Sequence, residues 1–423
     1  MKKGNLIVGL DVGTTKTCAV VGEIIPVKKT ERGFFSDNTD DAMVVDIIGV
    51  GNAPSSGVKK GVVINIERTA ESIKRAIEEV AAVTDIEIKA VYVGIAGDHV
   101  DSFSSQGVIA VRDKEINQRE VDRVIDAAKT VAIPLDREIL HVAPMGFTVD
   151  GQNGINDPRG MSGIRLEANV RIITGSATSV KNLIKSCQRA GIDILGIMLE
   201  PLASAEAILS MEERDMGAGI VDIGGGTANI TLFHEGNICY NSVLNVGGGN
   251  FTNDIAIGLR VPASEAEKIK KEYGCALLTM VKNNEEIEIT YEDKPGRKIP
   301  RQHLIEILQP RAEEVLYLIK EEIVKSGFYG LMTSGIVLTG GGVLLHGMDI
   351  MAENILELPV RIGKAKGIKG LTDIVSSPEY VTGVGLVLCG AKESAAERRM
   401  NGGGQFSEVK MMIKRWVNGI FKF

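Results

Sequence analysis

Residues 220–233, which read Ile-Val-Asp-Ile-Gly-Gly-Gly-Thr-Ala-Asn-Ile-Thr-Leu-Phe, constrain the fold of this chain more than any other segment. Two apolar, β-prone runs flank three glycines, so the segment predicts a β-hairpin whose turn adopts backbone angles that other residues avoid. Such a turn can aim several backbone N–H groups at one anion, which makes it a candidate phosphate cradle. Glycine-rich turns also occur in hairpins that bind nothing, so this segment alone leaves both interpretations open.

A second copy of the pattern strengthens the phosphate interpretation. Residues 8–21 read Val-Gly-Leu-Asp-Val-Gly-Thr-Thr-Lys-Thr-Cys-Ala-Val-Val. Aligning Asp11 with Asp222 places Gly13 on Gly224, between similar apolar runs. Two such hairpins predict two related lobes that face one phosphate chain.

A third glycine-rich segment, residues 335–348, runs from an apolar strand pattern into three glycines. A backbone without side chains can lie there against a flat base or sugar. The more common nucleotide motifs are absent from the sequence. It contains no P-loop, and the glycines at 224–226, 247–249 and 340–342 do not have the Gly-x-Gly-x-x-Gly spacing of a dinucleotide fold.

Composition excludes several other classes. The 423 residues suggest about three domains, and the net charge of −7 argues against nucleic acid as the main partner. The five cysteines lie far apart without a Cys-x-x-Cys pair, so we expect reduced core thiols in a cytoplasmic protein. Residues 1–5 lead directly into a strand pattern without a signal-peptide core, and no apolar run of about 18 residues predicts a membrane span.

The glycine-rich motifs occur in an order that resembles the actin, Hsp70 and sugar-kinase superfamily: Asp-x-Gly-Thr-Thr, then Asp-x-Gly-Gly-Gly-Thr, then Thr-Gly-Gly-Gly. Residues 85–164 carry their own strand and helix pattern, which ends in a turn-rich stretch at 150–163 that we expect to return to the first lobe. The place of this insert, together with Gly94-Ile-Ala-Gly97, resembles the bacterial actin-like cell-division family FtsA. The resemblance covers essentially the whole chain.

The resemblance implies an α/β, two-lobed actin-like ATPase fold with a family-specific inserted subdomain in the first lobe and a C-terminal amphipathic helix. The implied division of the chain is a first-lobe core at 1–84 and 165–198, an inserted subdomain at 85–164, a second-lobe core at 199–229 and 306–392, a small second-lobe subdomain at 230–305, a flexible linker at 393–406 and a membrane-targeting helix at 407–423.

The resemblance also implies a site for ATP and Mg²⁺. In the family picture, the carboxylates of Asp11 and Asp222 face each other and hold Mg²⁺ largely through water, whereas the alternative is an aspartate that only turns its own backbone. Nucleotide contacts are implied at Gly13, Thr14, Thr15, Lys16, Gly224, Gly225, Gly226, Thr227, Gly247, Gly248, Gly249, Gly340, Gly341 and Gly342. For Lys16, the alternative is a solvated strand end.

Further positions bear on hydrolysis and base binding. Glu200 falls where the superfamily places the residue that orients the attacking water, although an acid in the first turn of a helix also suits the helix dipole. Glu267 and Lys270 match a Glu-x-x-Lys that lines the nucleoside pocket in relatives, and the alternative is an ordinary surface pair. Many relatives carry an acid two residues after the threonine of the second hairpin, where this chain has Asn229. The resemblance therefore implies at most a slow ATPase.

Residues 407–423 have the pattern of an amphipathic helix. Lys410, Lys414, Arg415 and Lys422 against Glu408 give a net charge of 4 − 1 = +3. A helix of these 17 residues reaches about 25 Å, shorter than a bilayer core, so we expect it to lie in the membrane interface. Docking on the protein's own body is the alternative. The predicted membrane-facing residues are Val409, Lys410, Met412, Ile413, Lys414, Arg415, Trp416, Val417, Ile420, Phe421, Lys422 and Phe423.

The implied function is that of an ATP-dependent scaffold in cell division. The family self-associates into filaments, acts with other division proteins and tethers polymers of the tubulin-like protein FtsZ, through residues 230–305, to the cytoplasmic face of the cell membrane at the division site. The competing interpretations are a sugar kinase or phosphatase of the same superfamily and an actin-like member of a pilus-assembly or rod-shape system. A kinase would have no use for the amphipathic tail.

Overall fold

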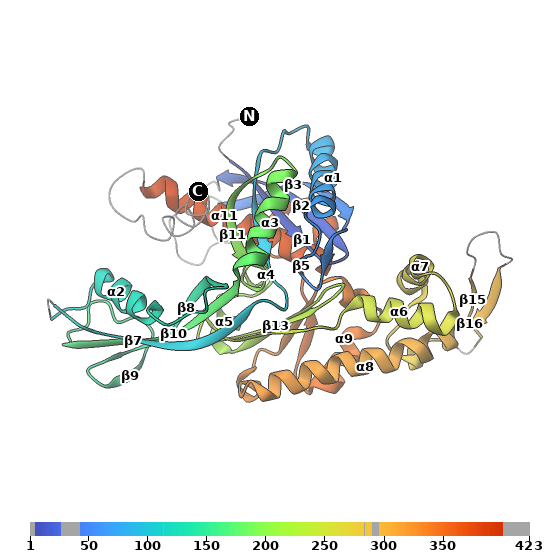
Figure 1. The fold of residues 1–423 in the computed structure, drawn as a ribbon. Coiled ribbons are helices and arrows are strands. Elements are labelled where there is room, and N and C mark those ends of the chain that lie inside the picture. Colours follow the sequence, from blue (N-terminus) through green and yellow to red (C-terminus); the bar gives the residue numbers. More distant parts are fainter. Residues whose placement is uncertain (1–4, 27–42, 113, 283, 290–295, 401–423) are drawn as a thin grey trace. The chain divides into compact units, whose positions relative to one another are not determined.

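The computed structural model describes residues 5–26, 43–112, 114–282, 284–289 and 296–400. The chain forms two compact units (Figure 1). The first consists of Met1–Ile95, Asn182–Ile208 and Lys364–Phe423, and the second of Ala96–Lys181 and Leu209–Gly363. Helix α3 (Ala177–Arg189) belongs to both.

The first unit is built on a six-stranded sheet in the order β11-β6-β1-β2-β3-β19. The β1, β2 and β3 strands form an antiparallel meander, whereas β6, β11 and β19 join in parallel. The strands are β1 (Leu6–Val12), β2 (Lys16–Pro26), β3 (Met43–Pro54), β6 (Ala90–Ile95), β11 (Asp193–Leu199) and β19 (Ile368–Gly370), with a small pair formed by β4 (Val58–Lys59) and β5 (Val62–Val63).

Helices cover this sheet because each has a buried apolar face. In α1 (Ile66–Thr84), Ile73, Ile77 and Val80 are buried, and the helix packs on β3 and β2. Helix α11 (Val381–Met400) packs on β1 and on α4 (Glu200–Ile208). The short helix α10 (Thr372–Val375) completes the unit.

The second unit contains a five-stranded sheet in the order β14-β13-β12-β17-β18. Its strands are β12 (Ala218–Ile223), β13 (Ala228–His234), β14 (Asn237–Leu244), β17 (Ile336–Thr339) and β18 (Val360–Ile362), and β15 (Glu286–Ile289) pairs separately with β16 (Arg297–Pro300). The helices around it are α5 (Met211–Met216), α6 (Gly248–Leu259), α7 (Ala263–Tyr273), α8 (Arg301–Lys325) and α9 (Met348–Leu356).

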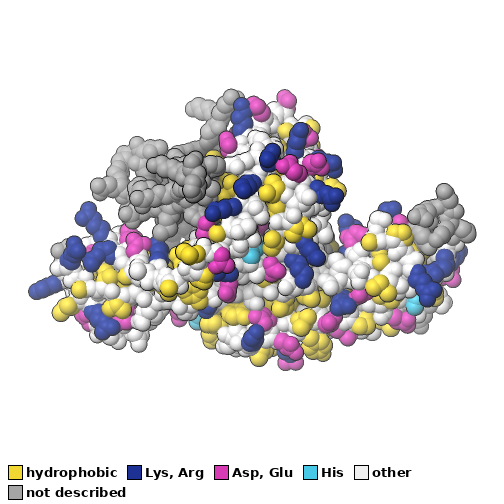
Figure 2. All heavy atoms as spheres, in the orientation of Figure 1, with side chains coloured by type: hydrophobic (Ala, Val, Ile, Leu, Met, Phe, Trp, Pro, Cys, Tyr) yellow, Lys and Arg dark blue, Asp and Glu magenta, His cyan; other side chains and the backbone are white. Residues whose placement is uncertain are grey.

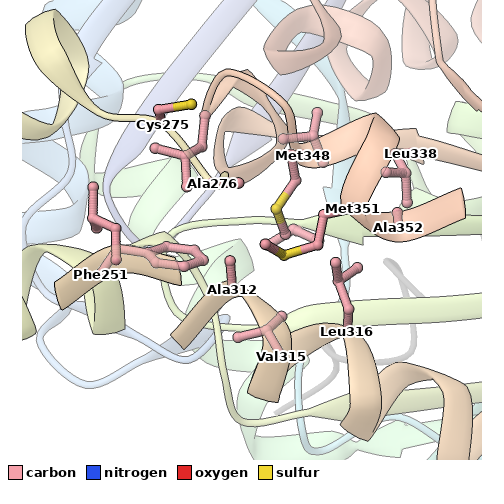
Figure 3. Packing of buried hydrophobic residues seen from close by; sticks show 14 of the residues in the cluster. Phe251, Cys275, Ala276, Ala312, Val315, Leu316, Leu338, Met348, Met351 and Ala352 are labelled. Carbon is pink, nitrogen blue, oxygen red and sulfur yellow. The ribbon is translucent and has the colours of Figure 1, made fainter. Parts of the chain in front are cut away.

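One apolar core contains residues of this sheet and of helices α6, α7, α8 and α9. Figure 3 shows Phe251 of α6 and Leu316 of α8 in the same cluster as Met351 of α9. Leu338 of β17, which is fully buried, joins that cluster two residues before the glycine run at 340–342. The core therefore anchors the strand from which this glycine loop departs.

The inserted subdomain is a four-stranded antiparallel sheet in the order β7-β10-β8-β9, with α2 packed on β7 and β10. Its own buried cluster includes Val124 of α2 and Leu166 of β10. The elements are β7 (Asp101–Ala110), α2 (Gln118–Lys129), β8 (Arg137–Val149), β9 (Gln152–Ile155) and β10 (Arg165–Ser176).

The structure corrects the boundaries that we expected for this insert. Residues 90–95 form β6 inside the six-stranded sheet, and residues 165–176 form β10, which pairs with β7 and β8 along its length. The turn-rich stretch at 150–163 contains β9 instead of returning to the first lobe. The pairings of β10 with β7 and of β6 with β1 join residues more than 50 positions apart, which explains why local patterns missed these two assignments.

Other boundaries also differ from expectation. Residues 230–244 belong to the main sheet, where β13 pairs with β12 and β14 pairs with β13, and do not form part of a separate small subdomain. Residues 200–208 and 364–392 belong to the first unit because α4 packs on α11 and α11 packs on β1. Helix α11 continues to Met400, so the first eight residues of the expected linker are helical, whereas 401–423, including the expected membrane helix, lie outside the described residues.

Charge is mixed on the surface. In Figure 2, Lys and Arg side chains lie among Asp and Glu side chains over the face in view. All five cysteines are free, and Cys18, Cys187, Cys239 and Cys275 are buried, as the sequence predicts. No helix in the described part of the chain is both long and apolar enough to cross a bilayer.

Candidate functional site

Both predicted glycine hairpins are confirmed, and they share one construction. The N–H of Gly13 donates to the carbonyl of Lys16 at 3.0 Å, and the N–H of Gly224 donates to that of Thr227 at 2.9 Å. In each hairpin an aspartate precedes this glycine by two residues, at the end of a strand. The strand register pairs Asp11 with Cys18 and Asp222 with Asn229.

Asp11 of the first hairpin lies among protein atoms that disfavour its charge. Burial raises the pKa of its carboxyl from 3.8 to about 6, although the nearby Lys16 ammonium acts in the opposite direction. Burial also raises the pKa of the Cys18 thiol to about 12, so the group opposite Asp11 is neutral. Asp11 is therefore poorly solvated as an anion.

Lys16 is anchored and not a solvated strand end. Its Nζ donates to the carboxylate and to the carbonyl oxygen of Glu379, both at 3.0 Å, and lies 4.0 Å from the centroid of the Tyr380 ring. An ammonium has three N–H donors, so these two contacts leave one for a ligand oxygen. Of the neighbouring threonines, Thr14 accepts from Gly61 N at 3.1 Å, and the Thr15 side chain is exposed.

In the second unit, the start of α6 is hydrogen-bonded to the turn of the second hairpin. The N–H of Gly248 donates to Gly224 O at 2.8 Å, and that of Gly249 donates to Gly225 O at 2.7 Å. A Cβ atom on Gly247 would lie 2.6 Å from Gly224 O, which is closer than real Cβ contacts allow. The two glycine runs thus touch backbone to backbone, and side chains at these positions would separate them.

The third glycine run reaches the same place. Gly340, with φ 87° and ψ 168°, directly follows β17, and a Cβ atom there would lie 2.2 Å from Oδ1 of Asp222. A Cβ atom on Gly248 would lie 3.8 Å from Cα of Gly342. The glycine runs at 224–226, 247–249 and 340–342, which are separate in sequence, therefore converge around Asp222.

Glu267 and Lys270 form more than a surface pair. Lys270 Nζ donates to Glu267 Oε2 at 2.6 Å, to Thr252 Oγ1 at 2.8 Å and to Gly248 O at 3.0 Å, so all three donors are used. Burial lowers the pKa of Lys270, whereas hydrogen bonds from Lys270 and Thr252 lower that of Glu267 despite its own burial. These contacts tie α7 to the glycine-rich start of α6.

Thr252 is a residue that the sequence analysis missed. Its hydroxyl donates to Glu267 and also contacts the carbonyl of Gly248 at 3.2 Å. The only signal in the sequence is its place one turn into a helix that starts at a glycine run, and this place predicts no side-chain partner. The structure instead makes Thr252 the link between Glu267 and Lys270.

Glu200 begins α4, and β6 brings Gly94 beside it. A Cβ atom at Gly94 would lie 2.8 Å from Cγ of Glu200 and 3.1 Å from its Oε1. The half-buried carboxylate therefore occupies space that only a glycine in β6 leaves open. This placement suits either expected role of Glu200, as a helix-start acid or as a residue that orients water.

Asp11 and Asp222 supply carboxylate oxygens, a donor type that Mg²⁺ accepts. Within the described residues, no group of three or more His, Cys, Asp or Glu side chains could hold a metal ion. Isolated carboxylates beside backbone N–H groups match Mg²⁺, which keeps most of its water and takes few protein ligands. A phosphate chain with a hydrated cation is thus a chemically suitable occupant.

Comparison with known proteins identifies relatives along the full chain. The family model "Cell division protein FtsA" matches residues 219–385, and the model "SHS2 domain inserted in FTSA" matches residues 97–174. The chain is 41% identical to cell division protein FtsA of Pseudomonas aeruginosa, with 100% of this chain and 99% of that protein covered. For the Escherichia coli K12 protein the identity is 35%, with 97% and 96% covered. The SHS2 match coincides with the sheet β7-β10-β8-β9.

Solved structures confirm the expected actin-like fold. The PilM-PilN type IV pilus biogenesis complex matches with a TM-score of 0.63 at 17% identity and covers 91% of this chain and 98% of that chain. MreB5 of Spiroplasma citri bound to AMPPNP matches with a TM-score of 0.53 at 15% identity and covers 95% and 100%. At these identities the likeness concerns the fold alone.

Proposed function

The chain belongs to the FtsA family of cell division proteins, and on this premise we propose that it binds Mg-ATP, self-associates and tethers FtsZ polymers to the cytoplasmic face of the membrane. The observation that carries the nucleotide part is the convergence of three glycine runs on Asp222. A glycine backbone leaves room for phosphates beside such a turn. The MreB5 neighbour was solved with AMPPNP.

The residues divide into roles around that ligand. Asp11 and Asp222 would hold Mg²⁺ largely through water, and the cation would neutralise phosphate charge. Gly13, Thr14, Thr15 and Lys16 would contact the phosphates from the first hairpin, and Gly224 to Thr227 from the second. Glu267 and Lys270, fixed by Thr252, would border the nucleoside, with the backbones of 247–249 and 340–342 against it.

A methyl group at Gly94 provides a test of Glu200 that leaves its chemistry intact. Because Cβ of Gly94→Ala would lie 2.8 Å from Glu200 Cγ, the carboxylate must move aside. We expect ATP hydrolysis to slow at least about tenfold, since catalytic groups tolerate little displacement, while ATP affinity stays within about twofold of the unmodified protein. Phosphate release and equilibrium binding measure the two effects. Glu200→Gln should slow hydrolysis to a similar extent. If hydrolysis is unchanged in both variants, Glu200 serves only as an acid at the start of the helix.

The tether rests on the sequence of residues 407–423. Each basic residue near an anionic leaflet contributes about 1 kcal/mol, so a net charge of +3 makes one tail a marginal anchor. Several tails on one polymer bind far more strongly, because each further tail binds intramolecularly. Membrane attachment would therefore depend on assembly.

Co-sedimentation with anionic liposomes tests the anchor. We expect the full chain to pellet, more so with Mg-ATP, and a truncation after Gln405 to stay in the supernatant. The double variant Lys410→Gln, Lys414→Gln should bind about 30-fold more weakly, from about 2 kcal/mol of lost attraction. If the truncated protein pellets as well as the full chain, the anchor lies elsewhere.

Recruitment of FtsZ needs a separate experiment. FtsZ polymers alone should leave the liposomes bare, and they should bind when the full chain is added. The protein truncated after Gln405 is the matched control, because it should bind FtsZ without bringing it to the membrane. Liposomes that carry the full chain but remain free of FtsZ would refute the tether.

A further inference from the structure

Asn229 carries a polar atom for which the protein provides no partner. The residue lies in β13 with only 7% of its surface exposed, and among the described residues its Oδ1 has no hydrogen-bond partner. A buried amide oxygen in that state costs free energy unless a group outside the protein satisfies it. The position of this atom therefore indicates what it binds.

The strand register places Asn229 beside Asp222. The two residues are direct cross-strand partners, so their side chains lie on the same face of the sheet. Further along that face, Thr231 donates to Asn241 Oδ1 at 2.7 Å, and both residues are buried. The buried amide oxygen of Asn241 on this face therefore has a partner. The oxygen without one, Asn229 Oδ1, lies beside Asp222, around which the glycine runs converge.

The first hairpin has no such acceptor directly opposite its aspartate; the comparable atom, Asn52 Oδ1, which also lacks a partner among the described residues, lies one strand further away in β3, opposite Cys18. In its equivalent register, the residue opposite Asp11 is Cys18, a buried thiol. A thiol is a weak hydrogen-bonding group, whereas an amide oxygen is a good acceptor that cannot donate. Of the two otherwise similar hairpins, the second presents an additional acceptor for a donor that comes with the ligand.

We propose that Asn229 is a positioning residue for the cation, and this inference rests on the proposed Mg-ATP site. Its Oδ1 accepts a hydrogen bond from a water molecule in the hydration shell of the Mg²⁺ held at Asp222. Mg²⁺ retains most of its water when bound, and that water is a strong donor. Because Asn229 is neutral, it orients the shell without adding a second negative charge beside Asp222.

The test compares two replacements in the full-length protein. Asn229→Leu keeps the approximate volume and removes the acceptor, whereas Asn229→Asp adds a charge. The readout is the affinity for a fluorescent ATP analogue over a titration of Mg²⁺ and in EDTA, together with the melting temperature without ligand. Thr231→Val is the matched control, because it removes a satisfied polar group from the same strand and face.

We expect the gain in nucleotide affinity that Mg²⁺ produces to fall about tenfold in Asn229→Leu, because one strong hydrogen bond from a water polarised by the cation is lost. Affinity in EDTA should not change, and Thr231→Val should keep the unmodified dependence on Mg²⁺ even if it melts earlier. Asn229→Asp should reach half-saturation at about tenfold less Mg²⁺.

Three results would overturn the inference. A folded Asn229→Leu protein with unmodified Mg²⁺ dependence would leave Asn229 a structural role. If that variant does not fold, an unchanged half-saturation in Asn229→Asp has the same meaning. If the unmodified protein binds nucleotide equally with Mg²⁺ and with EDTA, the proposed cation site fails first, and the role of Asn229 fails with it.

Discussion

Replacing Asp11 with asparagine is expected to stabilise the ligand-free protein and to weaken Mg-ATP binding at least about tenfold. The pKa of Asp11 is about 6 in the folded protein against an ordinary value of 3.8, so folding disfavours its charged form. At neutral pH this costs up to about 3 kcal/mol, which asparagine avoids. The same substitution removes a negative charge from the proposed cation site. Melting temperature without ligand and equilibrium binding with Mg-ATP measure the two effects.

The dependence on pH gives the sharpest check. A raised carboxyl pKa means that the folded state binds more protons than the unfolded state, so the unmodified protein loses stability as pH rises from about 4 through about 6. The advantage of Asp11→Asn should thus be absent at pH 4 and complete above pH 7. Asp193→Asn, an exposed substitution in β11 of the same unit, should show no such trend. A constant advantage at every pH would contradict the assigned cause.

Local motifs were sufficient to predict the parts of the site that the backbone makes. A glycine run between two apolar strands specifies its own turn, so both hairpins and the loop at 340–342 have the expected form. The order of these motifs also indicated the fold. Propensity and turn chemistry act over a few residues, and these features are equally local.

Features that depend on distant partners were not predictable in this way. Glu379, which anchors Lys16, lies 363 residues away in sequence, and the strands that fix β10 in the insert lie on either side of it in space. The oxygen of Asn229 lacks a partner because the described part of the folded chain places no donor beside it, and the spacing of residues in the sequence cannot reveal this. Thr252 became visible only once α6 and α7 were packed together.

Replacing Gly340 with alanine is expected to destabilise the second unit and to abolish nucleotide binding. The backbone at φ 87° and ψ 168° lies in a region that is essentially restricted to glycine, which costs another residue about 1–3 kcal/mol. The added Cβ would also lie 2.2 Å from Asp222 Oδ1 and 2.6 Å from Ile223 O, and the latter is backbone that cannot rotate away. We expect a loss of at least about 3 kcal/mol, or roughly 6–12 °C in melting temperature, and at least about 100-fold weaker Mg-ATP binding.

Gly341→Ala provides the matched control one residue along. A Cβ atom there meets nothing within 4 Å, so stability should stay within about 0.5 kcal/mol of the unmodified protein. If Gly340→Ala and Gly341→Ala melt at the same temperature, the close approach of the third glycine run to Asp222 is wrong. If they differ as expected but bind Mg-ATP equally well, the runs converge for packing alone, and the nucleotide lies elsewhere. Only a loss of both stability and Mg-ATP binding in Gly340→Ala would mean that the glycine runs converge on Asp222 to bind the nucleotide.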